Sequence, residues 1–306
     1  MFRFAAFAVS ALIFAAAQVA LPAIAGPSNV GPEKCEKCHR DETKVWDGTA
    51  HAKSFKTIHK HKTGKKILKA VGEKRMKRSE ICATCHYTTV EDGGKSKPVA
   101  GPSCESCHGK ASEWIAIHND YGGAGVKREQ ESAEHKAARI QKAKAAGMIR
   151  PEMLYDVAAN CMSCHGLANE NLSGEHASAM LDNGHPLNTN YEIVEYSQGT
   201  VRHRFYPPDV TVNKEMTKTE MARFYVIGQA AALVSATEAI KKTQHAKYVE
   251  GQNKRIAKAK SILSKVPEAS ALLAAPSAEA GRALADAIAD KDLTAIVGGE
   301  LPTKFK

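Results

Sequence analysis

Three features that define common protein classes are scarce or missing in this 306-residue sequence. Beyond residue 25, no stretch approaches the roughly 20 apolar residues of a membrane-spanning helix, so the mature chain is expected to have no membrane span. Alternation of polar and apolar residues is rare, which argues against a sheet-based fold. Aromatic residues make up only 6% of the chain. Few side chains are therefore available to stack on bases, and we expect no nucleic-acid partner.

Cysteine is absent outside one repeated motif. The eight cysteines form four Cys-x-x-Cys pairs, and histidine follows each pair directly. The four units are Cys35-Cys38-His39, Cys82-Cys85-His86, Cys104-Cys107-His108 and Cys161-Cys164-His165. In c-type haem attachment the two thiols add to the porphyrin vinyl groups, and the histidine becomes the proximal iron ligand. The motif therefore predicts four covalently attached haem c groups.

Three other readings of the cysteines are weaker. The pairs at Cys82/Cys85 and Cys104/Cys107 enclose 18 residues, a spacing that also fits a zinc ribbon. Four disulfides would each close a strained two-residue loop. A thioredoxin-like motif lacks its strand–helix context. None of these readings explains why histidine follows all four pairs.

The N-terminus carries the pattern of an export signal. Arg3 supplies the charged region, Phe4 to Ala20 form an apolar stretch, and Ala23-Ile24-Ala25 is a small-residue cleavage site. The pattern predicts cleavage after Ala25, although an uncleaved membrane anchor is the alternative. Covalent haem attachment occurs after export, so both signals predict a periplasmic protein.

The expected fold is mainly α with extensive irregular loops. Residues 1–25 are the signal peptide, and 26–214 form a tetrahaem-binding region built around a packed haem cluster. This region is rich in Gly, Pro, Asn and His, and haem faces are expected to supply the apolar area that its side chains lack. Residues 215–306 are expected to form a C-terminal helical region that packs on the haem core and has a structural or docking role.

Several helices are predicted by their end signals. Short helices are expected to carry some attachment units, and residues 127–146 should form a charged surface helix that ends at Gly147. The capping box Thr217-Lys-Thr-Glu220 predicts a helix from Lys218 to about Glu250. Further helices are expected at 255–265 and 278–289.

The basic residues are unevenly distributed. The net charge of +10 says little about partners, because eight haem propionates would offset most of it. Between Lys53 and Arg78, however, the sequence contains eleven basic residues and only one acidic residue, Glu73. Such a cluster attracts an acidic redox protein partner, whereas a solvated loop is the plainer reading.

Distal iron ligands must come from the remaining histidines or from methionine. Up to four are needed if every iron has two strong-field ligands. The candidates are His51, His59, His61, His118, His135, His176, His185, His203 and His245. No methionine has a distinctive context, so histidine is favoured at most sites.

The chain resembles the tetrahaem cytochrome c-554 family of multihaem c-type cytochromes over roughly residues 31–240. The matching stretches are Trp46-Asp-Gly-Thr-Ala-His51-Ala-Lys-Ser, Gly101-Pro-Ser-Cys104-Glu-Ser-Cys107-His108-Gly109, Gly184-His185-Pro186-Leu-Asn and Phe224-Tyr-Val-Ile-Gly228-Gln229.

The resemblance implies that distal histidines come from other parts of the chain than the proximal ones, with His51, His118 and His185 as the best candidates. It also implies a five-coordinate iron on His86. The basic stretch before that unit departs from the family and contains His59 and His61, either of which could close the open position. His176 and His203 compete near the fourth haem, and the pairing of histidines with irons stays open.

Two functions fit these expectations. The first is a periplasmic electron carrier without catalytic activity, which passes electrons between respiratory partners along closely spaced haems. The alternative is a haem enzyme that acts on nitric oxide, nitrite or hydroxylamine at a five-coordinate haem on His86. No Cys-x-x-Cys-Lys unit, which marks the catalytic haem of some nitrite reductases, is present. Donor, acceptor, potentials and oligomeric state have no signature in the sequence.

Overall fold

The computed structural model describes residues 26–306 and is mainly helical, as predicted. The predicted signal peptide and its cleavage site after Ala25 lie outside the described residues. No helix within 26–306 combines the length and the apolar character that crossing a membrane requires.

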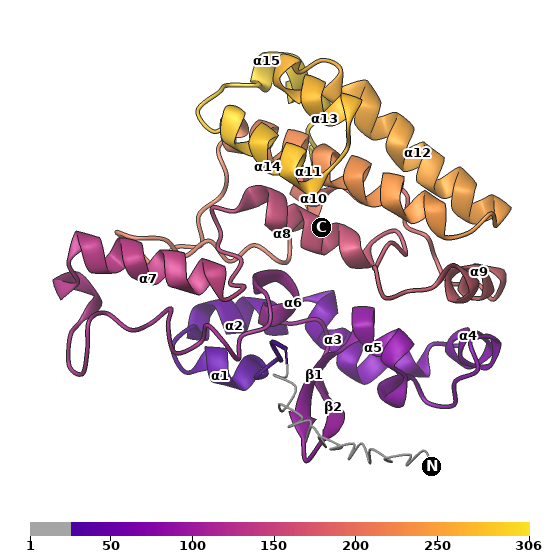
Figure 1. Cartoon of the computed structure of the whole chain (residues 1–306), viewed down its shortest axis with the longest axis horizontal. Coiled ribbons are helices and arrows are strands. Elements are labelled where there is room, and N and C mark those ends of the chain that lie inside the picture. The colour runs from indigo at the N-terminus through magenta and orange to yellow at the C-terminus, as the bar shows by residue number, and fades with distance from the viewer. Residues whose placement is uncertain (1–25) are drawn as a thin grey trace, which may run out of the picture.

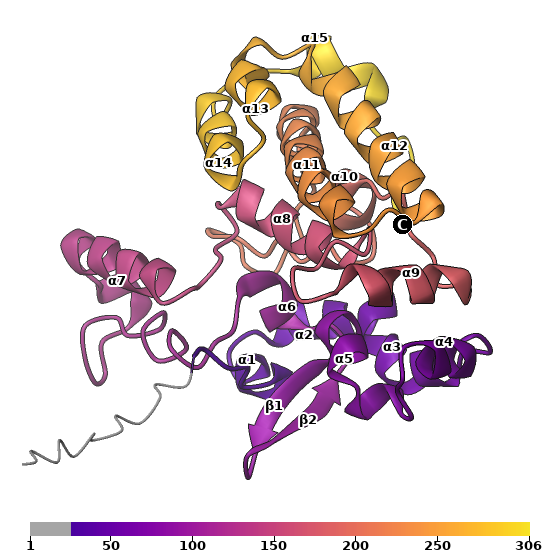
Figure 2. The ribbon, with the colours of Figure 1, turned by 45° about the vertical axis from the view of Figure 1, so that its right-hand side comes forward.

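The elements form a lower, a middle and an upper group (Figures 1 and 2). The lower group contains α1 Pro32–Glu36, α2 Arg40–Asp47, α3 Ala50–Thr57, α4 Gly64–Ala70, α5 Glu80–His86, β1 Thr88–Asp92 and β2 Lys95–Ala100. The middle group contains α6 Cys104–His108, α7 Ala133–Ala145, α8 Leu154–Cys164 and α9 Gly174–Asp182. The upper group contains α10 Ile193–Ser197, α11 Lys218–Ala239, α12 Ala246–Leu263, α13 Ser270–Ala274, α14 Ala278–Ala287 and α15 Thr294–Val297. Single 3-10 turns lie at Ile58–Lys60, Met76–Arg78, Arg128–Gln130, Ile240–Lys242, Pro267–Ala269 and Gly298–Glu300.

Short helices carry the attachment units, as predicted. Cys35 lies in α1, the second unit in α5, the third in α6, and both cysteines of the fourth in α8. The Ser79 hydroxyl caps α5 by accepting the backbone N–H of Cys82 at 3.3 Å. Ser103 caps α6 through a capping box with Ser106. These caps fix the start of each short helix, and therefore the direction in which its cysteines point.

An antiparallel hairpin, which the sequence did not predict, joins the second unit to the third. Strands β1 and β2 pair with Asp92 opposite Lys95, which leaves Gly93-Gly94 as the two-residue loop. Both glycines have positive φ, 58° and 74°, as a type I′ turn requires. The hairpin therefore returns the chain from His86 to Cys104 over a short distance.

The predicted C-terminal helices are confirmed in part. The capping box at Thr217 starts α11 at Lys218, but the helix ends at Ala239 rather than near Glu250. Thr243 adopts an extended conformation there. Its hydroxyl accepts the backbone N–H of His245 at 3.2 Å and bonds the Ser178 hydroxyl at 2.9 Å, so the break is tied to α9. The charged surface helix is confirmed, although α7 begins at Ala133 rather than Lys127.

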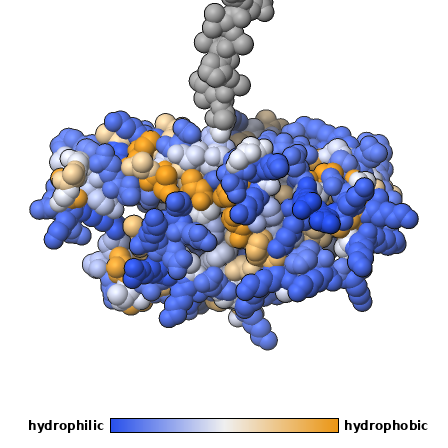
Figure 3. Space-filling view, turned by 90° about the horizontal axis from the view of Figure 1, so that it is seen from below, coloured by the Kyte–Doolittle hydropathy of each residue, from blue (hydrophilic) through white to orange (hydrophobic). Residues whose placement is uncertain are grey.

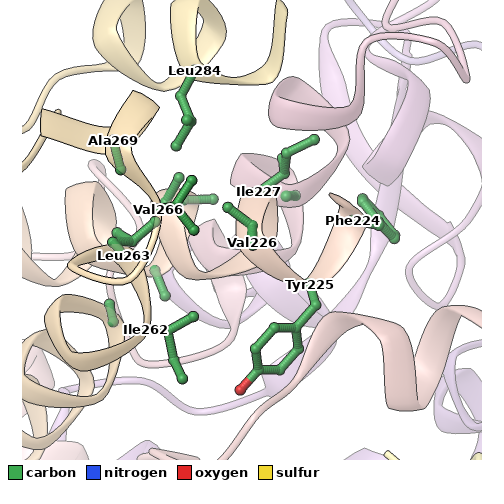
Figure 4. Close-up of a cluster of buried hydrophobic side chains, with 14 of the residues drawn as sticks. Phe224, Tyr225, Val226, Ile227, Ile262, Leu263, Val266, Ala269 and Leu284 are labelled. Carbon is green, nitrogen blue, oxygen red and sulfur yellow. The ribbon is translucent and has the colours of Figure 1, made fainter. Parts of the chain in front are cut away.

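The main hydrophobic core lies in the upper group (Figure 4). Helix α11 is buried on nearly all sides, with Phe224, Tyr225, Val226 and Ile227 all within the core. Helix α8, which carries the fourth attachment unit, enters the same core through three buried side chains, Tyr155, Ala158 and Met162. The C-terminal helices thus hold the fourth unit from above.

Truncating a side chain in this core should destabilise the protein without changing its cofactors. Leu263 is fully buried, so Leu263→Ala should lower the free energy of unfolding by about 2–5 kcal/mol. Chemical denaturation measures this loss, with Lys260→Ala at an exposed position of the same helix as the control. An equal stability of the two variants would mean that this core does not stabilise the fold.

Candidate haem-binding centre

All four Cys-x-x-Cys-His units line one cavity of about 2240 Å³. The lower group, α6 and α8 contribute the units, and Phe224 of α11 and Ile288, the residue that follows α14, help to complete the walls. Equal division among four units gives about 560 Å³ each, within the range of about 300–1000 Å³ typical of small-molecule sites. The cavity is thus large enough for four cofactors.

Each proximal histidine of these units faces a second histidine across the cavity. The ring centroids lie 6.4 Å apart in the pair His39–His118, 6.2 Å in His165–His51, 6.0 Å in His86–His185 and 6.1 Å in His108–His203. All eight side chains line the cavity. Four pairs at one spacing indicate a common ligand between the rings.

The spacing fits an iron atom between two imidazoles. A metal binds an imidazole nitrogen at about 2.0 Å, and that nitrogen lies about 1.1 Å from its ring centre, so two imidazoles on opposite faces of one metal have centroids about 6.2 Å apart. The four measured spacings of 6.0–6.4 Å match this value. The residues present therefore fit haem iron with two axial histidines at each unit.

The structure pairs each candidate distal histidine with a proximal one. It places His118 opposite His39, His51 opposite His165, and His185 opposite His86. The last pair occupies the position that the family resemblance implies to be open. His203, one of two competitors near the fourth haem, instead faces the third unit through His108.

The other candidate histidines lie elsewhere. His61 lines the cavity, but its Nδ1 lies 2.7 Å from the Thr63 hydroxyl. His59, His135, His176 and His245 do not line the cavity. His245 binds Asp182 at 2.9 Å, and His135 binds Glu131 at 2.8 Å. These four histidines therefore lie away from the proposed haem positions.

Hydrogen bonds orient four of the eight rings so that Nε2 is left for a metal. The Nδ1 of His108 lies 2.9 Å from the carbonyl of Ile149, and the Nδ1 of His118 lies 2.7 Å from the carbonyl of Ile115. His185 and His203 approach the carbonyls of Pro186 and Val201 at 2.9 and 2.7 Å. Because a carbonyl only accepts, each Nδ1 carries the proton and each Nε2 carries the lone pair.

Burial lowers the pKa values of six of the eight imidazoles and so favours the neutral form that metal ligation requires. Burial, and then the neighbouring His185 and His51, lowers the pKa of His86 to about 4. Burial, with smaller effects of His51 and Arg255, lowers the pKa of His165 to about 4. Burial also lowers the pKa values of His51 and His185.

Contacts between thiols give the order of the units in space. A hydrogen bond with Cys104 raises the pKa of Cys35, and one with Cys164 raises the pKa of Cys85. Burial, and then Cys161 and Cys164, raises the pKa of Cys107. The first unit therefore adjoins the third, the third adjoins the fourth, and the fourth adjoins the second.

This arrangement argues against the zinc-ribbon reading of the cysteines. A zinc ribbon would gather the cysteines of the second and third units, but Cys85 instead neighbours Cys164, and Cys104 neighbours Cys35. Within residues 26–306 no group of three or more Cys, His, Asp and Glu side chains forms a metal cage. Within residues 26–306 no disulfide joins any two of the eight cysteines.

Two packing features hold the first and third units together. The Trp46 Nε1–H donates to the carbonyl of Pro102 at 2.9 Å. A Cβ added at Gly101 would come within 2.0 Å of the carbonyl oxygen of His51. Only glycine permits this close approach, so the Trp46–His51 and Gly101–Pro102 stretches form one contact behind the candidate ligand His51.

Tyr191 is a cavity residue that the sequence did not reveal. Its ring stacks on His165 with centroids 4.1 Å apart and planes 13° apart, and Tyr196 stacks on its other side at 5.0 Å. The stack limits how far the His165 imidazole can turn about its axis. No motif marks this tyrosine in the sequence, because the contact depends on the fold alone.

A buried carboxylate anchors the N-terminal segment to the third unit. Glu105, which is 4% exposed, lies between the two cysteines of this unit. It accepts backbone N–H bonds from Val30 and Ala111 at 2.9 Å and from Gly31 at 2.8 Å.

Removing this carboxylate should therefore destabilise the fold. Glu105→Ala leaves three backbone N–H groups without their acceptor. Each of these groups that stays buried should lower the free energy of unfolding by about 1–3 kcal/mol. Thermal unfolding should show a marked loss, whereas Glu113→Ala at an exposed position should change little. If the two variants had the same melting temperature, Glu105 would not anchor the N-terminal segment.

Comparisons with known proteins agree with the motif analysis. The family model described as cytochrome c554 and c-prime matches residues 34–109. Cytochrome c-554 of Nitrosomonas europaea is 29% identical over 117 residues, which cover 36% of this chain and 50% of that protein. The chain thus spans half the length of this curated relative. No solved structure is significantly similar to the chain. Together, the family match over the first three attachment units and the identity with a curated member support the assignment of this chain to the cytochrome c-554 family.

Proposed function

We propose that this chain is a periplasmic tetrahaem c-type cytochrome that passes electrons between respiratory redox partners. The observation that carries the proposal is the set of four histidine pairs with ring centroids 6.0–6.4 Å apart. Haem c, held by the eight cysteines, would supply an iron that accepts and releases one electron. The chain would supply two imidazoles to each iron, and its hydrogen bonds and packing would orient them.

Two axial histidines at every unit favour electron transfer over catalysis. An electron carrier needs no substrate position on the iron, and constant ligation keeps the rearrangement small when the electron moves. Contacts between thiols connect the units in the order first, third, fourth and second. This continuous order supports a path through the whole cavity. The alternative enzyme requires an open iron position at His86, and the ring of His185, with its centroid 6.0 Å from that of His86, argues against it.

Opening one iron tests this ligand set. His185→Ala removes the ring opposite His86, so one of four low-spin irons should become high-spin and bind nitric oxide. Electron paramagnetic resonance of the oxidised protein measures the change. The matched control is His176→Ala, because His176 lies outside the cavity and its loss should leave the spectrum unchanged. A fully low-spin His185→Ala protein would show that another residue, such as His61, is the ligand.

The basic segment Lys53–Arg78 is the proposed docking surface for an acidic redox partner. Ten of its eleven basic residues are exposed, and the eleventh, Lys77, lies 3.5 Å from the Phe55 ring centroid. Within residues 26–306 none of the eleven forms an ion pair with an acidic side chain. Their charge is therefore available to a partner.

This segment also borders the cavity at the second unit. Ile67 and Thr63 line the cavity, and Thr63 neighbours Gly184, the residue before His185. The face seen from below is largely hydrophilic, with a band of hydrophobic residues across it (Figure 3). A partner bound to the segment would therefore lie near the end of the proposed electron path.

Reversing charges on this segment should slow electron entry. Lys65, Lys66 and Lys69 are exposed on α4, so their joint change to Glu should lower the rate of reduction by an acidic plant-type ferredoxin about tenfold or more at low salt. Stopped-flow kinetics measures the rate. The control changes Lys247, Lys254 and Lys260, which are exposed on α12, and so alters the net charge equally. Equal rates in both variants, or a wild-type rate that does not fall with salt, would contradict docking at this segment.

A further inference from the structure

One buried face of α12 packs against the segment that carries the fourth attachment unit and forms hydrogen bonds with it. Its residues Tyr248, Gln252 and Arg255 lie at successive helical turns and are 0–5% exposed. The Tyr248 hydroxyl donates to the carbonyl of Leu167 at 2.9 Å, and the Gln252 amide donates to the carbonyl of Gly166 at 2.8 Å. Helix α12 thus contacts the backbone immediately after His165.

Arg255 is unusual within this face because it is a buried cation without an anionic partner. Its guanidinium donates to the Gln252 side-chain oxygen at 2.7 Å, the Ser235 hydroxyl at 3.2 Å and the Met162 sulfur at 3.5 Å. All three acceptors are neutral, and no carboxylate in residues 26–306 lies within 4.0 Å of it. Burying an unpaired charge is costly, so its retention calls for a function.

The guanidinium lies directly behind the fourth unit. Gly166, the residue after His165, has φ of +108°, and a Cβ added there would come within 2.5 Å of the Arg255 Nη1. Glycine is therefore needed for the charge to approach the backbone this closely. Gly166 and Leu167 line the cavity, but Arg255 does not. The backbone thus separates the guanidinium from the cavity, so a haem propionate has no direct access to neutralise it.

Burial lowers the pKa of Arg255 to about 10, which leaves the side chain charged at neutral pH. The Arg255 side chain is 5% exposed, and in such a buried, low-dielectric region a fixed charge acts more strongly than in water. A nearby positive charge favours the reduced form of an iron centre, which carries one positive charge fewer, over the oxidised form.

We propose that Arg255 is the residue that raises the reduction potential of the fourth haem, so that an electron in the cavity rests preferentially at that unit. The inference rests on the proposed function. It gives the C-terminal helices a redox role in addition to their structural one, because the charge that sets this potential comes from α12. The fourth unit lies between the third and the second, so the preferred resting position is an inner one.

The test compares variants that separate the charge from the hydrogen bonds. Arg255→Met removes the charge and keeps most of the volume, and replacement of a buried charge by an apolar side chain of similar size commonly preserves folding. Potentiometric titration of the holoprotein should show that the reduction potential of one of the four haems is lower. The expected tenfold decrease in the equilibrium constant for its reduction corresponds to about 59 mV for one electron. Arg255→Lys keeps the charge and should keep the potential. Tyr248→Phe removes a neighbouring hydrogen bond and should leave all four potentials unchanged.

Each contrary outcome has a distinct meaning. If Arg255→Met left every potential in place, or if Arg255→Lys and Arg255→Met lowered the potential equally, Arg255 would be only a structural clamp and the proposal would fail. Should Arg255→Met not accumulate as holoprotein, Arg255→Gln makes the same comparison. Wild-type protein without four reversible couples would overturn the proposed function itself, independently of any variant.

Discussion

The arrangement of this protein depends on one geometric requirement, that two imidazoles face each other about 6 Å apart across each iron. The chain meets this requirement four times, with centroid spacings of 6.0–6.4 Å. Each pair joins segments that are distant in sequence, since His51 of α3 faces His165 at the end of α8, and His108 faces His203 in the loop before α11. The proposed cofactors would therefore also act as tertiary links, three between the lower and middle groups and one between α6 and the loop before α11.

The distribution of hydrophobic residues is consistent with this dependence. The upper group has a large core built from α8, α10, α11, α12 and the helices that follow. The lower group has only small clusters, such as the one around Leu68, Met76 and Tyr87. Its remaining apolar contacts would come from haem faces within the cavity. The C-terminal helices thus have a core of their own, whereas much of the apolar surface of the lower group faces the cavity.

The sequence predicted the attachment units because they are local: two thiols and a histidine within five residues define the chemistry wherever the fold places them. It also predicted the helical class and the start of α11, whose capping box is equally local. The hairpin was missed because β1 and β2 are short and only two of their eleven residues are buried, and only the Gly93-Gly94 turn marks them. The end of α11 at Ala239 was missed because Thr243 bonds Ser178, a residue far away in sequence. The partners of His86 and His108 depend on such long-range placement. Arg255 carried no signal at all, because its burial beside Gly166 exists only in three dimensions.

The spin state of all four irons in the native oxidised protein tests this account most directly. Electron paramagnetic resonance and magnetic circular dichroism distinguish six-coordinate, bis-histidine iron from five-coordinate iron. Four low-spin centres and no high-spin signal are the predicted result. A stoichiometric high-spin iron in the untreated protein would show that at least one pair, with His86–His185 the first to question, does not hold its metal from both sides.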